Sequence, residues 1–259
     1  MVKKFRLDIS IRFDATHERD GHTDTHRIAS RGKKLISSST SKTSQLDTAP
    51  TWLVKEFRTL LSPFIRLLLN QSLATGCFPR NYGQAIVLPL LKKNNLDAIQ
   101  PKNSRPVSNL CYLSKLLETV VQKQLQQFLD EHDAMPTHQS AYRKYHCTET
   151  ALLKLFNDLL VVVATDRGHV SGLCLLDLTA AFDTVDRDPL LSRLDRTFGV
   201  RGQARAWFRS YLTGRTFRVL LGGRTSQAAN VTCSVPRGSV LGPLLFILHT
   251  ADLADLFAD

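Results

Sequence analysis

The chain has 259 residues, of which 43% are hydrophobic, so it can bury a substantial core as one large domain or two small ones. Its 34 Lys and Arg outnumber 23 Asp and Glu, and the net charge of +11 favours polyanionic partners such as nucleic acid or acidic membrane surfaces. The N-terminus has no apolar core of signal-peptide length, and no later apolar run reaches the roughly 18 residues of a membrane span. The five cysteines are widely spaced without a Cys-x-x-Cys pair, which indicates reduced thiols. We therefore expect an intracellular chain, in the nucleus or the cytoplasm, with no membrane partner.

Residues 1–46 are charged and rich in Ser and Thr, with ten Lys or Arg against five Asp or Glu. This composition predicts a basic, disordered leader, followed by an ordered region over 47–259. The leader contains His17, His22 and His26. Because they lack a fourth ligand and a surrounding apolar pattern, we interpret them as solvated side chains and not as metal ligands.

The first half of the ordered region alternates helical and strand patterns. Apolar residues at helical spacing over 50–76 predict two helices, with a break at Ser62–Pro63 and an end at Gly76. Further along, the pattern predicts in order a strand over 85–91, a long basic loop over 92–109, an amphipathic helix over 112–132 and a helix over 149–165.

Asp177 follows a short apolar run over 173–176, which predicts a buried strand. A carboxylate at the end of a buried strand costs several kcal/mol unless it is paired, hydrogen-bonded or bound to a metal. The alternative is a helix cap, in which Asp177 or Thr179 accepts hydrogen bonds from the first amides of a helix starting at Ala180. This stretch alone leaves both interpretations open.

The last third of the chain is predicted to contain two short helices, over 189–198 and 202–212, and a hairpin with Gly222–Gly223 at its turn. A loop containing Pro236 and Gly238 follows, and the chain becomes helical again at about Pro243. Gly and Pro in such a loop let the backbone approach a flat ligand closely, although loops of this composition are common.

Positive charges gather in and beside the basic loop, at Lys92, Lys93, Lys102 and Arg105. Arg presents a planar fork of donors and Lys a point charge, so this segment could close over phosphates. The alternative is an ordinary solvated loop, because charge runs are usually exposed.

Taken together, these segments resemble the motifs of one family in its order. LPLLKKNN and NSRPVSNLCYLSKLLETVVQKQL are similar to the fingers motifs of reverse transcriptases from LINE-type, non-LTR retrotransposons, and HQSAYRKYHCTETALLKL resembles the next block. LLDLTAAFDTVD is similar to polymerase motif A, and SVPRGSVLGPLLFILHTADL to motif B. The resemblance extends over about 46–253. It implies an α+β fold with the fingers and an incomplete palm of a right-hand polymerase, and an antiparallel sheet packed on helices.

The resemblance also implies the roles of individual residues. Asp177 matches the catalytic motif A aspartate that holds Mg²⁺, and Leu178 would supply a carbonyl to the metal. Phe182 matches an aromatic gate that excludes a ribose 2′-hydroxyl. Asp183 and Asp186 are expected to lie on a helix surface or to support the metal ligands indirectly.

Further residues are implied to bind the nucleotide. Arg105 matches the arginine that contacts the incoming triphosphate, with Lys92 and Lys93 as weaker helpers, and Arg237 and Gly238 belong to motif B. The expected partners are an RNA template, a DNA primer and deoxynucleoside triphosphates (dNTPs).

The chain departs from the family pattern in three places. Arg237 stands where the family usually has Gln and offers only donors, and Ser104 replaces an aromatic residue. The final Phe257–Asp259 could start the motif C box, but ADLADLFAD continues a helical pattern. We therefore expect a chain truncated before motif C and the thumb, and inactive as it stands. The alternative is a non-catalytic nucleic-acid-binding protein or a translated relic.

Overall fold

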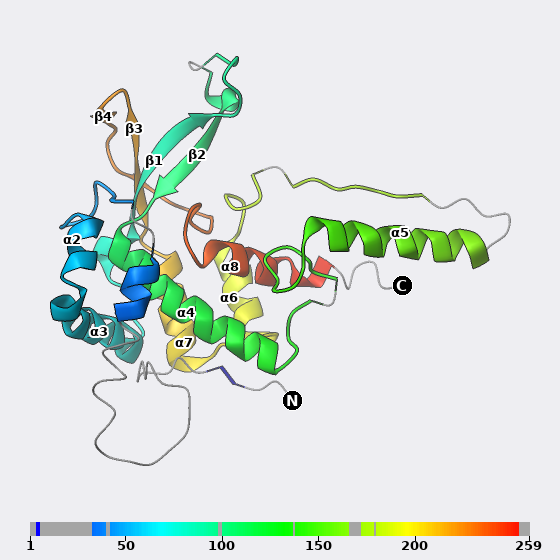
Figure 1. Cartoon of the computed structure of the whole chain (residues 1–259), viewed down its shortest axis with the longest axis horizontal. Helices are drawn as coiled ribbons and strands as arrows, with labels where there is room; N and C mark the ends of the chain where they lie inside the picture. The colour runs from blue at the N-terminus through cyan, green and yellow to red at the C-terminus, as the bar shows by residue number, and fades with distance from the viewer. Residues whose placement is uncertain are drawn as a thin grey trace, which may run out of the picture.

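A computed structural model describes residues 4–5, 33–39, 42–97, 100–136, 138–165, 172–178 and 180–253. The helices are α2 (Thr51–Glu56), α3 (Arg58–Thr75), α4 (Tyr112–Glu131), α5 (Thr148–Thr165), α6 (Arg187–Arg196), α7 (Gly202–Leu212) and α8 (Gly242–His249). The strands are β1 (Gln84–Leu91), β2 (Ser104–Asn109), β3 (Thr216–Leu221), β4 (Arg224–Thr225) and β5 (Ala229–Asn230). Short 3₁₀ turns are η1 (Arg80–Gly83), η2 (Pro101–Asn103) and η3 (Ala251–Leu253). Figure 1 shows helices gathered beside a small sheet, from which the β1–β2 hairpin extends.

The strands form one mixed sheet in the order β2-β1-β3-β4, with β5 also paired to β3. The β1–β2 pair is antiparallel, whereas β1 and β3 are parallel. The prediction of an antiparallel sheet is therefore wrong for this pair. β2 returns the chain to the end of the sheet where β1 begins, and helices α4 to α7 lie in the chain between β2 and β3.

Strand β2 lies inside the stretch predicted to be a long loop. Its register places Pro106 opposite Pro89 of β1. β2 is the last strand on its side of the sheet, and the β3 pairing of β1 ends at Val87. Both prolines therefore occupy positions where a missing N–H costs little, which explains why two prolines do not break the hairpin.

The other elements follow the predicted pattern except for the break between the first two helices. The helices change at Phe57, whose carbonyl accepts the Leu61 N–H at 2.9 Å, and not at Ser62–Pro63. Pro63 lies in the second turn of α3. The helix continues beyond Pro63 because residues on its apolar face pack in the core. Gly76 ends α3 with a left-handed φ of 66°, as predicted.

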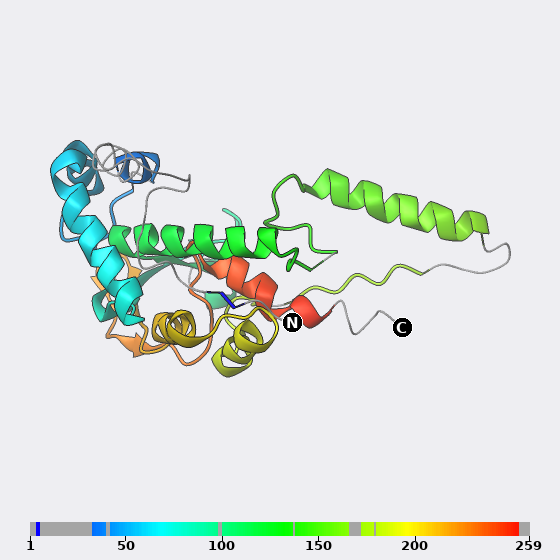
Figure 2. The same cartoon turned by 90° about the horizontal axis from the view of Figure 1, so that it is seen from below.

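An aromatic cluster centred on Trp207 of α7 joins the helices in the core. Trp207 is fully buried and stacks on Tyr211 with ring centroids 5.5 Å apart. Its Nε1–H donates to Ser72 Oγ of α3 at 3.0 Å. Phe78 meets both rings edge-on. Figure 2 shows α7 and α6 on the opposite side of the molecule from α2.

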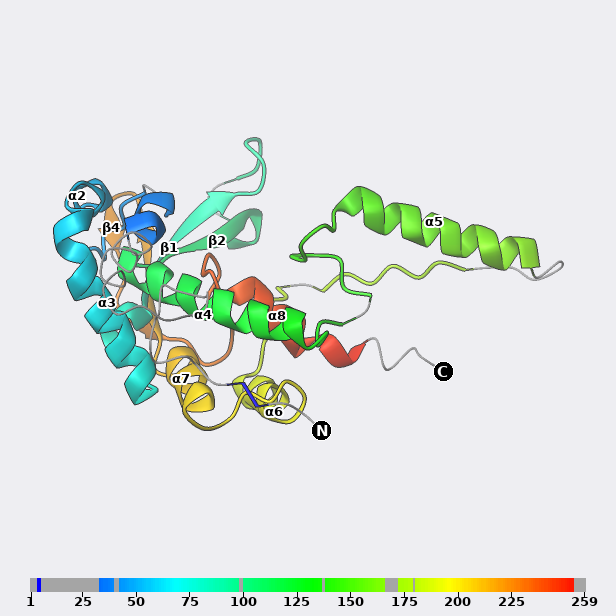
Figure 3. The same ribbon diagram turned by 60° about the horizontal axis from the view of Figure 1, so that its bottom comes forward.

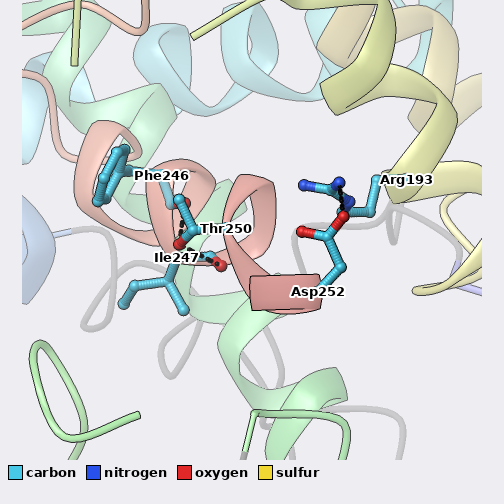
Figure 4. A network of polar contacts seen from close by, with 5 residues as sticks. All are labelled: Arg193, Phe246, Ile247, Thr250 and Asp252. Atoms are coloured by element: carbon cyan, nitrogen blue, oxygen red, sulfur yellow. Dashed lines mark hydrogen bonds and ion pairs between the residues drawn. The ribbon is translucent and has the colours of Figure 1, made fainter. Parts of the chain in front are cut away.

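The end of α8 is held against α6 by polar contacts (Figure 4). Arg193 of α6 forms an ion pair with Asp252 of η3. Thr250 Oγ1 donates to the Phe246 carbonyl at 3.1 Å and to the Ile247 carbonyl at 3.3 Å, which completes the last turn. These contacts fix the C-terminal end of α8 against α6. The glycine- and proline-rich loop leads into α8 at its other end.

Most of the predicted leader falls outside the described residues, and the 1–46 boundary stays a prediction. Within the part that the structure describes, apolar residues of the leader pack on the ordered region, among them Phe5 and Ile36. Phe5 is 3% exposed and its N–H donates to the Gly199 carbonyl at 2.8 Å. Ile36 is buried against Tyr112 and Leu116 of α4.

Helix α5 and the segment that follows it extend away from the body of the molecule (Figures 1 and 3). Residues 172–178 form no strand and are exposed, with Leu175 81% exposed, so the predicted buried strand is wrong. An apolar run becomes a strand only where it pairs with another strand, and residues 172–178 pair with none of the described strands. Despite the apolar surface of α5, none of the helices in the described ranges is long and apolar enough to cross a membrane.

Candidate functional site

The β1–β2 hairpin carries the cations predicted to bind phosphate. Arg105 stands opposite Leu90, and the ladder continues through a hydrogen bond from the Lys92 N–H to the Asn103 carbonyl at 2.8 Å. Arg105, Lys92 and Lys93 are all exposed. The hairpin therefore presents three positive charges to solvent on a backbone of fixed register, where they are accessible to an anion.

Residues 234–242, here called the 234–242 loop, pack directly on β2. Gly238 has a φ of 77°, and a Cβ atom on it would lie 2.6 Å from the Ser108 carbonyl oxygen. A side chain at position 238 would therefore force the loop or the strand to move. Ser108 belongs to the same strand as Arg105, so this contact joins the loop to the hairpin that carries the cations.

The start of the 234–242 loop is bonded to the turn that precedes α6. The Val235 N–H donates to the Phe182 carbonyl at 3.0 Å, and the Ser234 N–H to the Val185 carbonyl at 2.9 Å. The Phe182 ring packs against Phe246 of α8 with centroids 5.2 Å apart. Packing is thus a role that the structure shows for Phe182, and its role as a nucleotide gate stays a prediction.

Arg237, which replaces the usual Gln, forms an ion pair across these two segments. Its Nη2 lies 2.7 Å from Asp183 Oδ2, with side chains 26% and 46% exposed. Water screens such a pair, so we expect it to contribute at most about 1 kcal/mol. The sequence did not reveal Asp183 as the partner of Arg237. The nucleotide contact of Arg237 stays a prediction.

A cavity of about 300 Å³ opens between the sheet and the 234–242 loop. The sheet contributes apolar side chains, whereas the turn before α6 and the loop contribute polar groups. The lining includes Val87, Ser108, Phe217, Asp183, Pro236 and Arg237. Its volume is at the lower end for small-molecule sites, which combine apolar walls with a few polar groups.

Asp177 and Leu178 lie on the exposed segment 172–178 and belong to none of these contacts. Asp177 caps no helix: a turn follows at 180–184, and the first helix afterwards is α6. The cap of α6 is Asp186, whose Oδ1 accepts the Asp188 N–H at 3.3 Å. The capping interpretation of Asp177 is therefore wrong, and Thr179, the other candidate cap, falls outside the described residues.

The described residues do not assemble a metal site around Asp177. Among them, no three His, Cys, Asp or Glu side chains lie close enough together to hold one ion. Asp183 is paired with Arg237, and Asp186 caps α6. A two-ion site needs several carboxylates, so the residues present do not fit one, and Mg²⁺ stays an expectation from the family resemblance.

Comparison with known proteins establishes the ancestry of these segments. Residues 91–259 match the family model described as "Reverse transcriptase (RNA-dependent DNA polymerase)". This chain belongs to the reverse transcriptase family. Members of this family generally use divalent metal ions. The assignment of the hairpin cations to the fingers and of the 234–242 loop to motif B stays a prediction.

Curated relatives come from retrotransposons of insects. The chain is 32% identical over 195 residues to the probable RNA-directed DNA polymerase from transposon BS of Drosophila melanogaster. It is 31% identical over 192 residues to the RNA-directed DNA polymerase from mobile element jockey of Drosophila funebris. Each match covers 73% of this chain and 20% of the relative, so the chain spans about a fifth of their length. The prediction of a reverse transcriptase domain from a LINE-type, non-LTR retrotransposon is confirmed.

Proposed function

We propose that this reverse transcriptase chain binds an RNA–DNA primer–template and a dNTP, for RNA-templated DNA synthesis as the inherited reaction. The observation that carries the proposal is the packing of Gly238 on Ser108: a Cβ atom at position 238 would lie 2.6 Å from the Ser108 carbonyl oxygen. This contact holds the 234–242 loop beside the strand of Arg105, and the loop borders a cavity of about 300 Å³. In this account β1 and β2 belong to the fingers, and the 180–186 turn and the loop belong to the palm.

Each part of the site then has a separate task. Arg105 binds the triphosphate through its planar fork, and Lys92 and Lys93 add point charges nearby. Gly238 lets the loop backbone come close to β2. Phe182, fixed by its packing on Phe246, excludes a ribose 2′-hydroxyl.

Magnesium is expected to be bound through the Asp177 carboxylate and the Leu178 carbonyl. If magnesium were bound there, it would supply positive charge beside a phosphoryl group. Among the described residues, Asp177 belongs to no group of three His, Cys, Asp or Glu side chains that could hold an ion. No step of the reaction is therefore assigned to the metal.

A second candidate function is nucleic-acid binding without synthesis. The specific observation in its favour is that Asp177 sits on an exposed segment, whereas the hairpin and the 234–242 loop are already in contact. The net charge of +11 would support salt-dependent binding to either strand.

Primer extension on an RNA template with the full chain, dNTPs and Mg²⁺ separates the two candidates, with Asp177→Ala as the matched variant. Synthesis that is lost in Asp177→Ala supports the first candidate. Salt-sensitive binding that is equal in both proteins, without synthesis in either, supports the second. Absence of both binding and synthesis would contradict both candidates.

A further inference from the structure

Glu118 is a buried carboxylate in α4 that has no part in the site described so far. Its side chain is fully buried. Its Oε1 accepts the Ser114 hydroxyl at 2.8 Å, and its Oε2 accepts the backbone N–H groups of Val240 at 2.7 Å and Leu241 at 3.3 Å. A buried carboxylate is costly unless hydrogen bonds compensate it, so these three bonds mark a specific arrangement.

The two backbone bonds reach the end of the 234–242 loop. Leu241 is the N-cap position of α8 and makes no side-chain capping bond. Glu118, from a different helix, accepts the N–H of this residue and that of Val240 before it, and a negative charge is favoured near the N-terminal end of a helix. The next amide, that of Gly242, donates to Ser239 Oγ at 2.9 Å. Glu118 of α4 therefore holds the C-terminal end of the loop.

A buried arginine balances the charge of Glu118. Arg215, directly before β3, is 3% exposed and donates through Nη1 to the Tyr211 carbonyl at 3.0 Å. Its guanidinium lies over the rings of Tyr211 and Phe78. Burial raises the pKa of Glu118, whereas the positive charge of Arg215 and the three hydrogen bonds act in the opposite direction. α4, β3 and the loop thus meet in one buried polar cluster.

This cluster is one of the two points at which the 234–242 loop is held. The loop is held at its start by the bonds to Phe182 and Val185, and at its end by Glu118. Between these points Gly238 touches Ser108. If the Glu118 anchor is removed, the loop can move away from β2, since the contact at Gly238 involves no side chain of its own.

We propose that Glu118 is a positioning residue of the nucleotide site, which holds the 234–242 loop against β2 so that Pro236 and Arg237 line the cavity. This inference rests on the proposed function for its nucleotide part only. The anchoring of the loop is a separate claim that holds whether or not the chain synthesises DNA.

Two substitutions separate hydrogen bonding from burial. In Glu118→Gln the amide oxygen can accept from Val240 and Leu241, and the amide nitrogen can donate to Ser114 Oγ. Glu118→Leu keeps a similar volume in the core but has no acceptor. Both substitutions leave the buried Arg215 without the charge that balances it, so this cost is common to the two variants and their difference reports the acceptor. The melting temperature of each full-length variant, measured first, shows whether it is folded.

Hydrogen exchange of the full chain tests the anchor without any assay of function. We expect the amides of Val240 and Leu241 to exchange about tenfold or more faster in Glu118→Leu, and at nearly the wild-type rate in Glu118→Gln. Amides in α7 should not change in either variant. Wild-type protection of Val240 and Leu241 in Glu118→Leu would overturn the anchor.

Nucleotide affinity tests the positioning role. The readout is the Kd of the next correct dNTP for the full chain on a primer–template whose primer ends in a dideoxynucleotide. We expect Glu118→Leu to weaken it about tenfold and Glu118→Gln to restore it. If Glu118→Leu mobilises the loop but leaves this Kd unchanged, the positioning role is overturned. If Arg105→Ala also leaves it unchanged, the proposed function fails, while the exchange result still decides on the anchor.

Discussion

Arg237 and Asp183 form an ion pair of 2.7 Å that joins the 234–242 loop to the turn before α6. Backbone bonds connect the same two segments, from Val235 to Phe182 and from Ser234 to Val185. The pair therefore reinforces a contact that the main chain already makes. This arrangement gives the arginine at position 237 a charged partner within the protein.

Arg237→Gln is expected to lower the free energy of unfolding by less than about 1 kcal/mol, because the pair is partly exposed and screened. Asp183→Asn should have an effect of similar size. A double-mutant cycle measured by urea unfolding gives their coupling, which we expect to be about 0.2–1 kcal/mol and to fall with added salt. A coupling above about 2 kcal/mol would show that the pair is more than a surface contact.

Gly238→Ala should destabilise the protein more than Gly223→Ala. Both glycines have a φ of 77°, so the two substitutions share the strain of a left-handed conformation. A Cβ at Gly223 meets no atom within 4 Å, whereas at Gly238 it would lie 2.6 Å from the Ser108 carbonyl. We expect about 1 kcal/mol or more of additional loss for Gly238→Ala in urea unfolding. Equal losses would contradict the close approach of the loop to β2.

Trp207→Ala should cost about 3–5 kcal/mol of unfolding free energy, because it removes a fully buried ring. The matched control is Trp52→Ala in α2, where the ring is 64% exposed and the expected change is within about 0.5 kcal/mol. Urea unfolding followed by circular dichroism measures both changes. Similar losses of unfolding free energy in the two variants would contradict a core centred on Trp207.

The stability of the chain should depend on pH through Glu118. Burial raises the pKa of this carboxyl above its ordinary 4.5, so the folded state binds a proton more tightly than the unfolded state does. The resulting stability is fully present below pH 4.5 and is lost as the pH rises through the folded pKa. The neighbouring Cys111 has its pKa raised to about 11, and burial also raises that of Tyr211, so neither titrates in this window.

The measurement is the difference in unfolding free energy between the wild type and Glu118→Gln from pH 4 upwards. We expect the wild type to lose stability relative to Glu118→Gln as the pH rises, because glutamine does not titrate. A difference that stays constant, or one that favours the wild type at higher pH, would show that the hydrogen bonds outweigh burial.

Local signals in the sequence were enough for several elements. The apolar face of α4 predicted a helix over 112–132, and the structure has Tyr112–Glu131. Gly222–Gly223 marked the β3–β4 turn, where both residues have positive φ. These features depend on neighbours a few residues apart, so periodicity and turn chemistry reveal them.

Features that depend on distant partners were not predictable in this way. The run over 173–176 has the composition of a strand, but whether it pairs depends on an available strand edge elsewhere in the fold. Glu118 has the appearance of a polar residue on an amphipathic helix, and its hydrogen-bond partner Val240 lies 122 positions away. Gly238 was singled out for a close approach to a ligand, and the structure shows a close approach to Ser108.

The measurement that tests the central claim most directly is the effect of Arg105→Ala on dNTP affinity in the complex with a dideoxy-terminated primer–template. Arg196→Ala, which removes an equally exposed charge at the end of α6, is the matched control. The account predicts that Arg105→Ala raises the Kd about tenfold or more, and that Arg196→Ala leaves it unchanged. An unchanged Kd in Arg105→Ala, or equal losses in both variants, would contradict a nucleotide site formed by the β1–β2 hairpin and the 234–242 loop.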